Sequence, residues 1–364
     1  MTIDAVGGVW RYGIDLCRTL ATKGTHVLVV GLGPEPSAAQ WEEARALRNA
    51  DFVWLDIPLD WQVDEPGPLA SLPQWLGELV HRWEIDLLHL NLPSQAADLK
   101  VDRPIVVTSH SCRATWWQAV RGGAMPAEWD WNRAYTARGL QMADLIVAPS
   151  YGHAAALERV YGLPPNAVRV VPNGTGAARR IYRKANLVLA AGRWWDDAKN
   201  GRAIDAAAEH VDWPVFMAGQ LSGPDRQHCR LEHACPLGDR RPDEIRRLMG
   251  RTPIFVSASL FEPFGLAVLE AAMAEAALVL SDIPTFRELW HGAALFVDPH
   301  DPQALAEAIN RLVLDETERL ALAQAARRRS EIYTLEAQSE RMLQVYDEAM
   351  SSHPSIAIPA GQCA

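Results

Sequence analysis

Two glutamates, Glu262 and Glu270, stand on either side of a Pro-Phe-Gly-Leu turn that opens an Ala- and Leu-rich stretch, Phe264–Ala276. The composition of this stretch predicts a helix, and helical side chains lean toward the helix N-terminus. Both carboxylates can therefore reach a ligand bound at that end, where they would accept hydrogen bonds from neutral hydroxyls of a sugar or a ribose. The structural alternative is a helix cap and an ordinary surface glutamate.

The start of the same stretch also offers backbone donors. The preceding run, Ile254–Ser257, is apolar and β-prone, so the turn joins a strand to a helix. The amides of Phe264, Gly265 and Leu266 then fall in the first helical turn, where N–H groups lack partners and the helix dipole favours an anion. Gly265 lets a ligand approach the backbone closely. A phosphate group is the expected anion.

Two cations, Arg193 and Lys199, follow another predicted strand, Leu187–Ala190. Arginine binds phosphate as a fork, and lysine binds it as a compact charge. When a diphosphate leaves the C1 atom of a sugar, it gains negative charge, and fixed cations stabilise that transition state more than the ground state. The pair predicts a diphosphate site, with solvated surface cations as the alternative.

Glycines and a histidine mark the first half of the chain. Gly7-Gly8-Val9 can open a helix after a strand and permit close approach of a phosphate or a sugar, or can form a plain turn. His110 follows the predicted strand Ile105–Thr108, where it can bind sugar hydroxyls or move protons. A structural histidine with satisfied hydrogen bonds is the alternative.

An aromatic and basic stretch, Arg113–Arg138, has three interpretations. Its residues Arg113, Trp116 and Trp117 can form an acceptor pocket, because aromatic faces stack on sugars. The stretch can instead dock on an anionic membrane surface. It can also be ordinary helix packing with solvated arginines.

The sequence does not favour a metal or a dinucleotide cofactor. There is no Asp-x-Asp motif, and Asp196-Asp197 is the one adjacent aspartate pair. Cys229 and Cys235 have a spacing that suits no common structural zinc site. Gly31-Leu32-Gly33-Pro34 lacks the third glycine of a dinucleotide fingerprint and predicts a loop.

Strands that alternate with helices predict two doubly wound parallel-sheet domains. In such sheets ligands bind beyond the carboxyl ends of the strands, so two domains that face each other enclose a cleft. The predicted strands are Val27–Val30, Phe52–Leu55, Leu87–Leu90, Ile105–Thr108, Leu145–Ala148, Leu187–Ala190, Val215–Ala218, Ile254–Ser257, Leu278–Ser281 and Leu295–Val297, with helices that include Val9–Leu20, Leu69–Trp83, Pro302–Leu314, Glu316–Ser330 and Leu335–Met350.

A turn-rich, charged stretch between Pro164 and Lys184, which includes Arg179 and Arg180, predicts the linker. We expect an N-terminal domain over residues 1–175, a second domain over 176–334, a final helix over 335–350 and a loose tail over 351–364. The chain reaches Gly7 after few residues, so the first strand is expected either to be short or to have lost its beginning.

Bulk composition excludes several classes of protein. The formal net charge of -10 argues against a nucleic-acid binder. No run of 18 apolar residues and no signal peptide is visible, and the five cysteines include no Cys-x-x-Cys pair. These features predict a cytoplasmic protein with reduced thiols.

Taken together, the motifs resemble retaining glycosyltransferase family 4, of the GT-B fold. The resemblance covers most of the chain and is strongest over residues 185–300. It rests on the glutamate pair, on Gly192-Arg193 with Lys199, on Pro172-Asn173-Gly174, on Ser281-Asp282-Ile283-Pro284, on Arg287-Glu288-Leu289, on Gly7-Gly8-Val9 and on His110. One departure is Glu275-Ala276-Ala277-Leu278, where the family often has a glycine-containing turn.

The resemblance implies a role for each matched residue. Arg193 and Lys199 would hold the donor diphosphate, Glu270 the ribose and Glu262 the donor sugar, and His110 would lie near the reacting carbon. Phe264, Gly265 and Leu266 would offer backbone amides, and Gly219 and Leu237 would lie near the base. The final helix would pack back on the first domain.

The predicted function is transfer of a sugar from a nucleoside-diphosphate sugar to an acceptor hydroxyl, with retention of configuration and without a metal or other cofactor. The acceptor can be a carbohydrate, a lipid-linked molecule or another small molecule. The alternatives are another GT-B enzyme, such as a nucleotide-sugar epimerase or a phosphorylase, and a weakly catalytic relative that binds nucleotide sugars.

Overall fold

The computed structural model describes residues 1–176, 182–223 and 227–353 and divides the chain into two compact units. Unit 1 comprises Met1–Gly174 and Leu335–Ala364, and unit 2 comprises Thr175–Thr334. Arg179 and Arg180 of the predicted linker, and residues 354–364 of the predicted tail, lie outside the described residues. Ser351 and Ser352, which were assigned to that tail, belong to the last helix.

Unit 1 holds two parallel sheets, one of order β3-β2-β1 and one of order β4-β5-β6-β7. Hydrogen bonds between Thr2 and Asn91, rather than a strand ladder, join β1 to β4. The reversal of strand order at this point is the topological switch of a doubly wound sheet. The strands are β1 (Thr2–Asp4), β2 (Val27–Leu32), β3 (Ala50–Trp54), β4 (Leu88–Leu90), β5 (Ile105–Thr108), β6 (Leu145–Ala148) and β7 (Val168–Val170).

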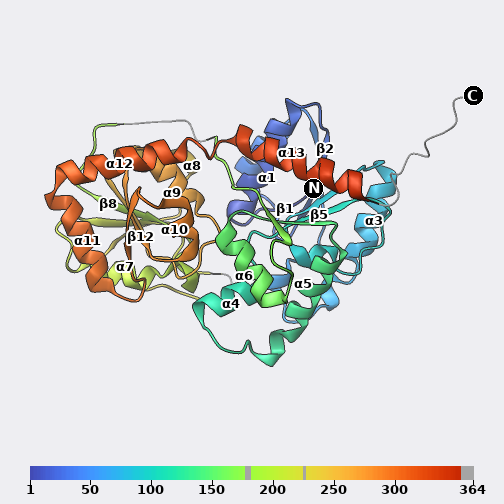
Figure 1. The fold of residues 1–364 in the computed structure, drawn as a ribbon, viewed down its shortest axis with the longest axis horizontal. Helices are drawn as coiled ribbons and strands as arrows, with labels where there is room; N and C mark the ends of the chain where they lie inside the picture. Colours follow the sequence, from blue (N-terminus) through green and yellow to red (C-terminus); the bar gives the residue numbers. More distant parts are fainter. Residues whose placement is uncertain (177–181, 224–226, 354–364) are drawn as a thin grey trace, which may run out of the picture. The chain divides into compact units, whose positions relative to one another are not determined.

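Helices cover both faces of the four-stranded sheet, because alternate residues of each strand point to opposite faces. Val106 and Val147 pack with α1 and α13, whereas Ile105 and Val107 pack with α3, α5 and α6. Figure 1 shows α13 beside α1. The helices are α1 (Gly8–Ala21), α2 (Ala38–Arg45), α3 (Leu72–Arg82), α4 (Arg113–Val120), α5 (Asp130–Met142), α6 (Tyr151–Tyr161) and α13 (Leu335–Ser352), with short 3-10 turns η1 (Asp60–Gln62), η2 (Gly67–Leu69), η3 (Pro93–Ala96) and η4 (Ala127–Trp129).

The first strand, β1, is short but buried. Thr2 and Ile3 are each 1% exposed, and all three residues of the strand pair with β2. The Met1 amine donates to Leu28 O at 2.7 Å, and burial lowers the pKa of this amine to about 6. These three residues bring the chain to the positive-φ residue Gly7 at the start of α1.

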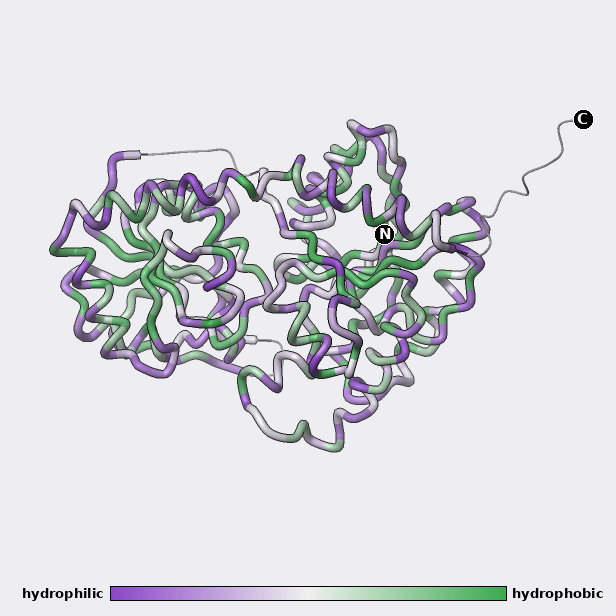
Figure 2. The backbone as a smooth tube through the Cα atoms, viewed as in Figure 1, coloured by the Kyte–Doolittle hydropathy of each residue, from purple (hydrophilic) through white to green (hydrophobic). Residues whose placement is uncertain are grey.

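Unit 2 holds a six-stranded parallel sheet of order β10-β9-β8-β11-β12-β13. Val188 and Ala190 face α7 and α11, whereas Leu189 between them faces α8, α9 and α10. Figure 2 shows hydrophobic residues along these strands and hydrophilic residues on the outer helices. The strands are β8 (Val188–Ala191), β9 (Val215–Ala218), β10 (Cys235–Gly238), β11 (Ile254–Ser257), β12 (Ala277–Ser281) and β13 (Ala294–Val297). The helices are η5 (Asp197–Lys199), α7 (Gly201–Ala208), α8 (Pro242–Arg251), α9 (Leu266–Met273), α10 (Pro284–Trp290), α11 (Pro302–Leu314) and α12 (Glu316–Ser330).

The prediction of two α/β domains built on parallel sheets is confirmed, with local corrections. Strands β7 and β10 were missed, because one is three residues long and the other contains Pro236 and Gly238. The predicted helix Phe264–Ala276 is shorter, since α9 spans Leu266–Met273. Gly265 before it and Glu275 after it both have positive φ, 92° and 59°. Glu275 thus takes the left-handed position after a helix that glycine usually fills.

Candidate functional site

An ion pair between Lys199 and Glu262 lies at the topological switch point of unit 2. Lys199 ends η5 in the loop after β8, and Glu262 lies in the loop after the neighbouring strand β11. Lys199 Nζ donates to Glu262 Oε2, and the two side chains are 20% and 14% exposed. The carboxyl ends of β8 and β11 therefore bring a cation and a carboxylate together where doubly wound sheets bind ligands.

Asn200, which the sequence analysis missed, ties these loops together. Its side-chain Nδ2 donates to Ala258 O at 3.0 Å and to Pro299 O at 2.7 Å, in the loops after β11 and β13. Its backbone is left-handed, with φ 53° and ψ 43°. A second link runs from Leu260 N to Ala198 O at 2.8 Å. These bonds fix the position of Lys199. In the sequence, the only indication of this role is that Asn200 directly follows a candidate phosphate-binding lysine.

Arg193 lies in the same loop, nearer the end of β8. Its side chain is 41% exposed, lies over the ring of Trp195 at 5.3 Å and is 3.6 Å from Asp196 Oδ2. The adjacent Trp194 is buried and donates its Nε1–H to Ala218 O at 3.1 Å, which anchors the loop to β9. The Arg193 guanidinium is thus partly exposed on an anchored loop.

The amides of Phe264 and Gly265 lie in the turn before α9 and not, as the sequence analysis predicted, in its first helical turn. Phe264 and Gly265 precede the helix, and Leu266 is its first residue. The Phe264 side chain is 3% exposed and packs edge-on against Tyr333, so it anchors the turn. No side chain caps this helix end within the described structure, so the first amides of α9 keep their capacity to bind an anion. Glu270, one turn into α9, is half-buried.

Gly219 directly follows β9, and Leu237 lies in the neighbouring strand β10. Gly219 follows β9 with φ 121°, and a Cβ placed there would lie 1.9 Å from Gly192 O. Its N–H donates to Gly238 O at 2.9 Å, which joins it to β10, the strand that carries half-buried Leu237. Only glycine fits Gly219, because the loop after β8 passes directly over it.

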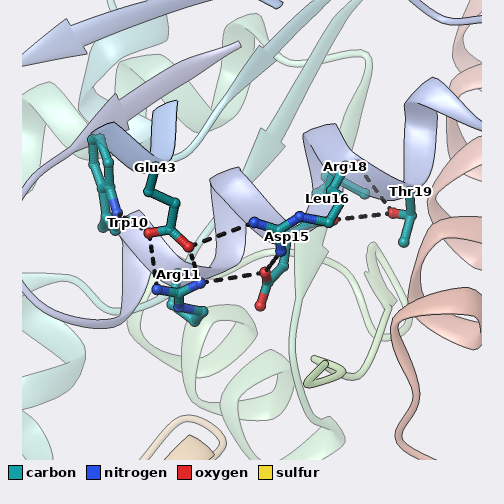
Figure 3. A network of polar contacts seen from close by, with 7 residues as sticks. All are labelled: Trp10, Arg11, Asp15, Leu16, Arg18, Thr19 and Glu43. Carbon is teal, nitrogen blue, oxygen red and sulfur yellow. Dashed lines mark hydrogen bonds and ion pairs between the residues drawn. The ribbon is translucent and has the colours of Figure 1, made fainter. Parts of the chain in front are cut away.

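In unit 1, Gly7 and Gly8 stand at the start of α1, and a polar network anchors that helix. Arg11 binds Glu43 of α2 through two bonds, at 2.6 and 3.0 Å, and Trp10 Nε1 donates to Glu43 at 3.2 Å. Figure 3 shows this carboxylate between the α1 side chains. Burial opposes ionisation of Glu43, but its bonds with Arg11 outweigh that effect and lower its pKa. Gly7 has φ 82°, and no side chain caps α1 within the described structure.

His110 follows β5 and is partly exposed. Its Nε2 lies 2.9 Å from Asn91 Oδ1, and Tyr12 of α1 packs edge-on against its ring at 4.3 Å between centroids. Burial, together with nearby His153, lowers the pKa of His110 to about 3. The imidazole is therefore neutral at pH 7.

The aromatic stretch is largely engaged in its own packing. Arg113 donates to Trp61 O at 3.0 Å and lies 4.5 Å from the ring centroid of Trp129. Trp117 packs edge-on against the same Trp129 and donates to a backbone oxygen. Trp116 lies beneath Arg121 at 5.3 Å. These contacts favour the helix-packing interpretation over an open acceptor pocket at these three residues.

Neither a metal site nor a membrane span is found among the described residues. No group of three or more His, Cys, Asp or Glu side chains in those ranges is arranged to hold a metal ion. Cys229 is buried whereas Cys235 is exposed. No helix in the described parts of the chain has the length and apolar character needed to cross a bilayer.

Comparison with known proteins places these features in a family. Residues 6–179 match the model for "Glycosyltransferase Family 4", and residues 177–329 match the model for "Glycosyl transferases group 1". A D-inositol 3-phosphate glycosyltransferase from Xylanimonas cellulosilytica is 27% identical, and the match covers 96% of this chain and 93% of that protein.

Solved structures share the fold. A sucrose-phosphate synthase from Thermosynechococcus elongatus superposes with a TM-score of 0.77 at 19% identity, over 96% of this chain and 99% of that one. HepE from Anabaena, solved with UDP and glucose, superposes with a TM-score of 0.73 at 18% identity, over 96% of this chain and 100% of that one. The chain belongs to glycosyltransferase family 4 and is a glycosyltransferase of the GT-B fold.

Proposed function

We propose that the chain transfers a sugar from a nucleoside-diphosphate sugar to an acceptor hydroxyl, with retention of anomeric configuration and no need for a metal. The observation that carries the proposal is the Lys199–Glu262 pair between the loops after β8 and β11. One partner can neutralise phosphate charge, and the other can accept bonds from sugar hydroxyls. A diphosphate and a sugar are joined in one molecule in a nucleotide sugar.

The geometry suggests how each group would act. Arg193, Lys199 and the amide end of α9 would surround the diphosphate with positive charge and dipoles. As the bond from C1 to the leaving oxygen breaks, charge develops on the phosphate, and these fixed groups stabilise it. Glu270 would accept bonds from the ribose and Glu262 from the donor sugar. Gly219 and Leu237 would lie beside the base.

Retention and metal independence are proposed from the family resemblance and from the local cations, which can supply the charge that a metal would otherwise bring. A nucleotide-sugar donor is supported by HepE, which was solved with UDP and glucose. Two relatives are named for phosphorylated carbohydrates, inositol 3-phosphate and maltose-1-phosphate. Phosphorylated polyols and sugars are therefore the first acceptors to test.

The test has two stages. Thermal shifts with UDP-, GDP- and ADP-sugars identify the donor, and the purified protein is then assayed for transfer to a panel of plain and phosphorylated polyols and sugars, with and without a chelator. Product NMR reports the anomeric configuration. We expect one donor class to stabilise the protein and an α-linked product from an α-linked donor, unaffected by the chelator. Absence of binding, hydrolysis and transfer with every donor would refute the proposal.

A further inference from the structure

A chain of buried hydrogen bonds fixes the side-chain amide of Asn91, the residue after β4. Its Nδ2 donates to Thr2 O at 2.7 Å, and its backbone N–H donates to Thr2 Oγ1 at 2.9 Å. The Thr2 hydroxyl in turn donates to Gln95 Oε1 at 2.6 Å. If the Asn91 amide turned over, its oxygen would face the carbonyl oxygen of Thr2, and two acceptors would meet. Oδ1 of Asn91 must therefore point away from Thr2.

That oxygen lies 2.9 Å from His110 Nε2. A carboxamide oxygen can only accept, so the ring must carry its hydrogen on Nε2. Burial and His153 keep the pKa of His110 at about 3, so the ring holds no second proton at pH 7. Nδ1 is consequently an acceptor and cannot donate.

The groups around the ring leave Nδ1 available. Tyr12 of α1 contacts the ring edge-on, and burial raises the pKa of its hydroxyl. His153 of α6 and His89 of β4 are the titratable groups that interact with the ring electrostatically, and burial lowers the pKa of both. Asn91 is the hydrogen-bond partner of His110 within the described ranges, and the ring is partly exposed.

We propose that Asn91 is a positioning residue that holds His110 as the neutral Nε2–H tautomer, so that Nδ1 accepts a hydrogen bond from a hydroxyl of the bound sugar or acceptor. This inference rests on the proposed function, because that function supplies the hydroxyl. It makes His110 an orienting acceptor, and it excludes an imidazolium that stabilises the leaving group. Thr2 contributes by holding the Asn91 amide in one orientation.

The first test needs no variant. The full chain is labelled with nitrogen-15 histidine, and long-range proton–nitrogen NMR reports which ring nitrogen of each histidine carries hydrogen. The His110 signals are assigned by their loss in His110→Gln. We expect Nε2 to be protonated and Nδ1 bare from about pH 5 to 8. A His110 ring with hydrogen on Nδ1, or one that titrates in this range, would overturn the proposal.

The second test asks whether Asn91 is the residue that holds His110 in the Nε2–H tautomer. Asn91→Leu removes the acceptor, and we expect a mixture of His110 tautomers and an about tenfold loss of kcat/KM, the effect of one neutral hydrogen bond. Affinity for the nucleoside diphosphate, which lacks the sugar, should not change. Asn91→Asp loses the bond to Thr2 O but keeps an acceptor toward His110, so it should keep the Nε2–H tautomer. Its added charge should raise the His110 pKa toward the pH range of the NMR measurement.

Ser109→Ala is the matched control, because it removes a buried bond to His153 at 3.0 Å and leaves the Asn91–His110 contact in place. It should keep the His110 tautomer. A pure Nε2–H tautomer with full kcat/KM in Asn91→Leu would overturn the inference. The inference and the proposed function fail separately: absence of all transfer by the wild type refutes the function, whereas the wrong tautomer in an active enzyme refutes only the role of Asn91.

Discussion

The Lys199 ammonium and the Glu262 carboxylate form an ion pair although 63 residues separate them in the chain. Their loops follow β8 and β11, which are adjacent in the sheet. Each group holds its partner in place at the switch point, and Glu262 lies beside Gly265, the residue before α9. The fold thus holds together the two residues to which we assign opposite tasks toward a nucleotide sugar.

Lys199→Ala should lower turnover by about 10²- to 10³-fold, the effect of removing one group that stabilises developing charge. The measurement is steady-state transfer or donor hydrolysis, with circular dichroism to verify the fold. Arg202→Ala is the matched control, since it removes an exposed cation three residues further along the chain, in the first turn of α7. Turnover in Lys199→Ala equal to that of the wild type would exclude the diphosphate role.

Asn200→Gly should weaken donor binding while it keeps the backbone conformation. Glycine adopts the left-handed backbone of Asn200 freely but cannot donate to Ala258 and Pro299. The loss of two hydrogen bonds predicts a destabilisation of about 1–3 kcal/mol and a more mobile Lys199. Calorimetric titration with the preferred nucleoside diphosphate, together with the melting temperature, measures both effects. If neither quantity moves, Asn200 does not position the loop.

Gly219→Ala should disrupt the loop that carries Arg193. The added Cβ would lie 1.9 Å from Gly192 O, and the backbone there has φ 121°. We expect a lower melting temperature and loss of most donor affinity. Gly238→Ala separates the two causes, because its φ is also positive, at 67°, but nothing lies within 4 Å of the added Cβ. Equal effects in both variants would show that backbone strain, and not the clash, is responsible.

Glu270→Ala should weaken binding of the nucleoside diphosphate by about tenfold to a hundredfold, because hydrogen bonds to a charged acceptor are worth about 1.5–3 kcal/mol. Isothermal titration calorimetry gives this value directly. Glu307→Ala on the exposed side of α11 serves as the comparison. An unchanged dissociation constant in Glu270→Ala would remove the ribose role from this carboxylate.

Acid should destabilise unit 1. Burial lowers the pKa of His89 well below its ordinary value, that of His110 to about 3 and that of His153 to about 4. Below about pH 6.5 the unfolded chain therefore binds more protons than the folded chain. The free energy of unfolding then decreases as the pH is lowered, by up to about 1.4 kcal/mol per pH unit for each histidine.

The check is hydrogen exchange of β5 and α13 peptides between about pH 7 and 5, corrected for intrinsic rates. His89→Gln should reduce the pH dependence, because one of the four contributing groups, the three histidines and the Met1 amine, no longer takes part. His26→Gln, which changes an exposed histidine beside Asp51, is the comparison variant. An equally steep dependence in His89→Gln would rule out His89 as a source of the acid effect.

The sequence determined the class of fold and the family, because both follow from patterns of residues that are close together in the chain. Short continuous apolar runs predicted strands such as Ile105–Thr108 and Ile254–Ser257 with the bounds that the structure shows. The glutamate pair and the two cations stand at short spacings near predicted strand ends, so they could be proposed as site residues without coordinates. Strand β10 was not predicted, because Pro236 and Gly238 interrupt its apolar pattern.

The tertiary structure alone decided which partner each side chain meets. Asn200 reaches carbonyls 58 and 99 residues away, and Asn91 meets Thr2 across 89 residues. No local pattern encodes such pairs, because parallel crossovers bring distant strand ends to one edge of a sheet. The position of the hydrogen on the His110 ring is also a feature that only the tertiary structure determines. It depends on an amide whose orientation is fixed by the first strand of the chain.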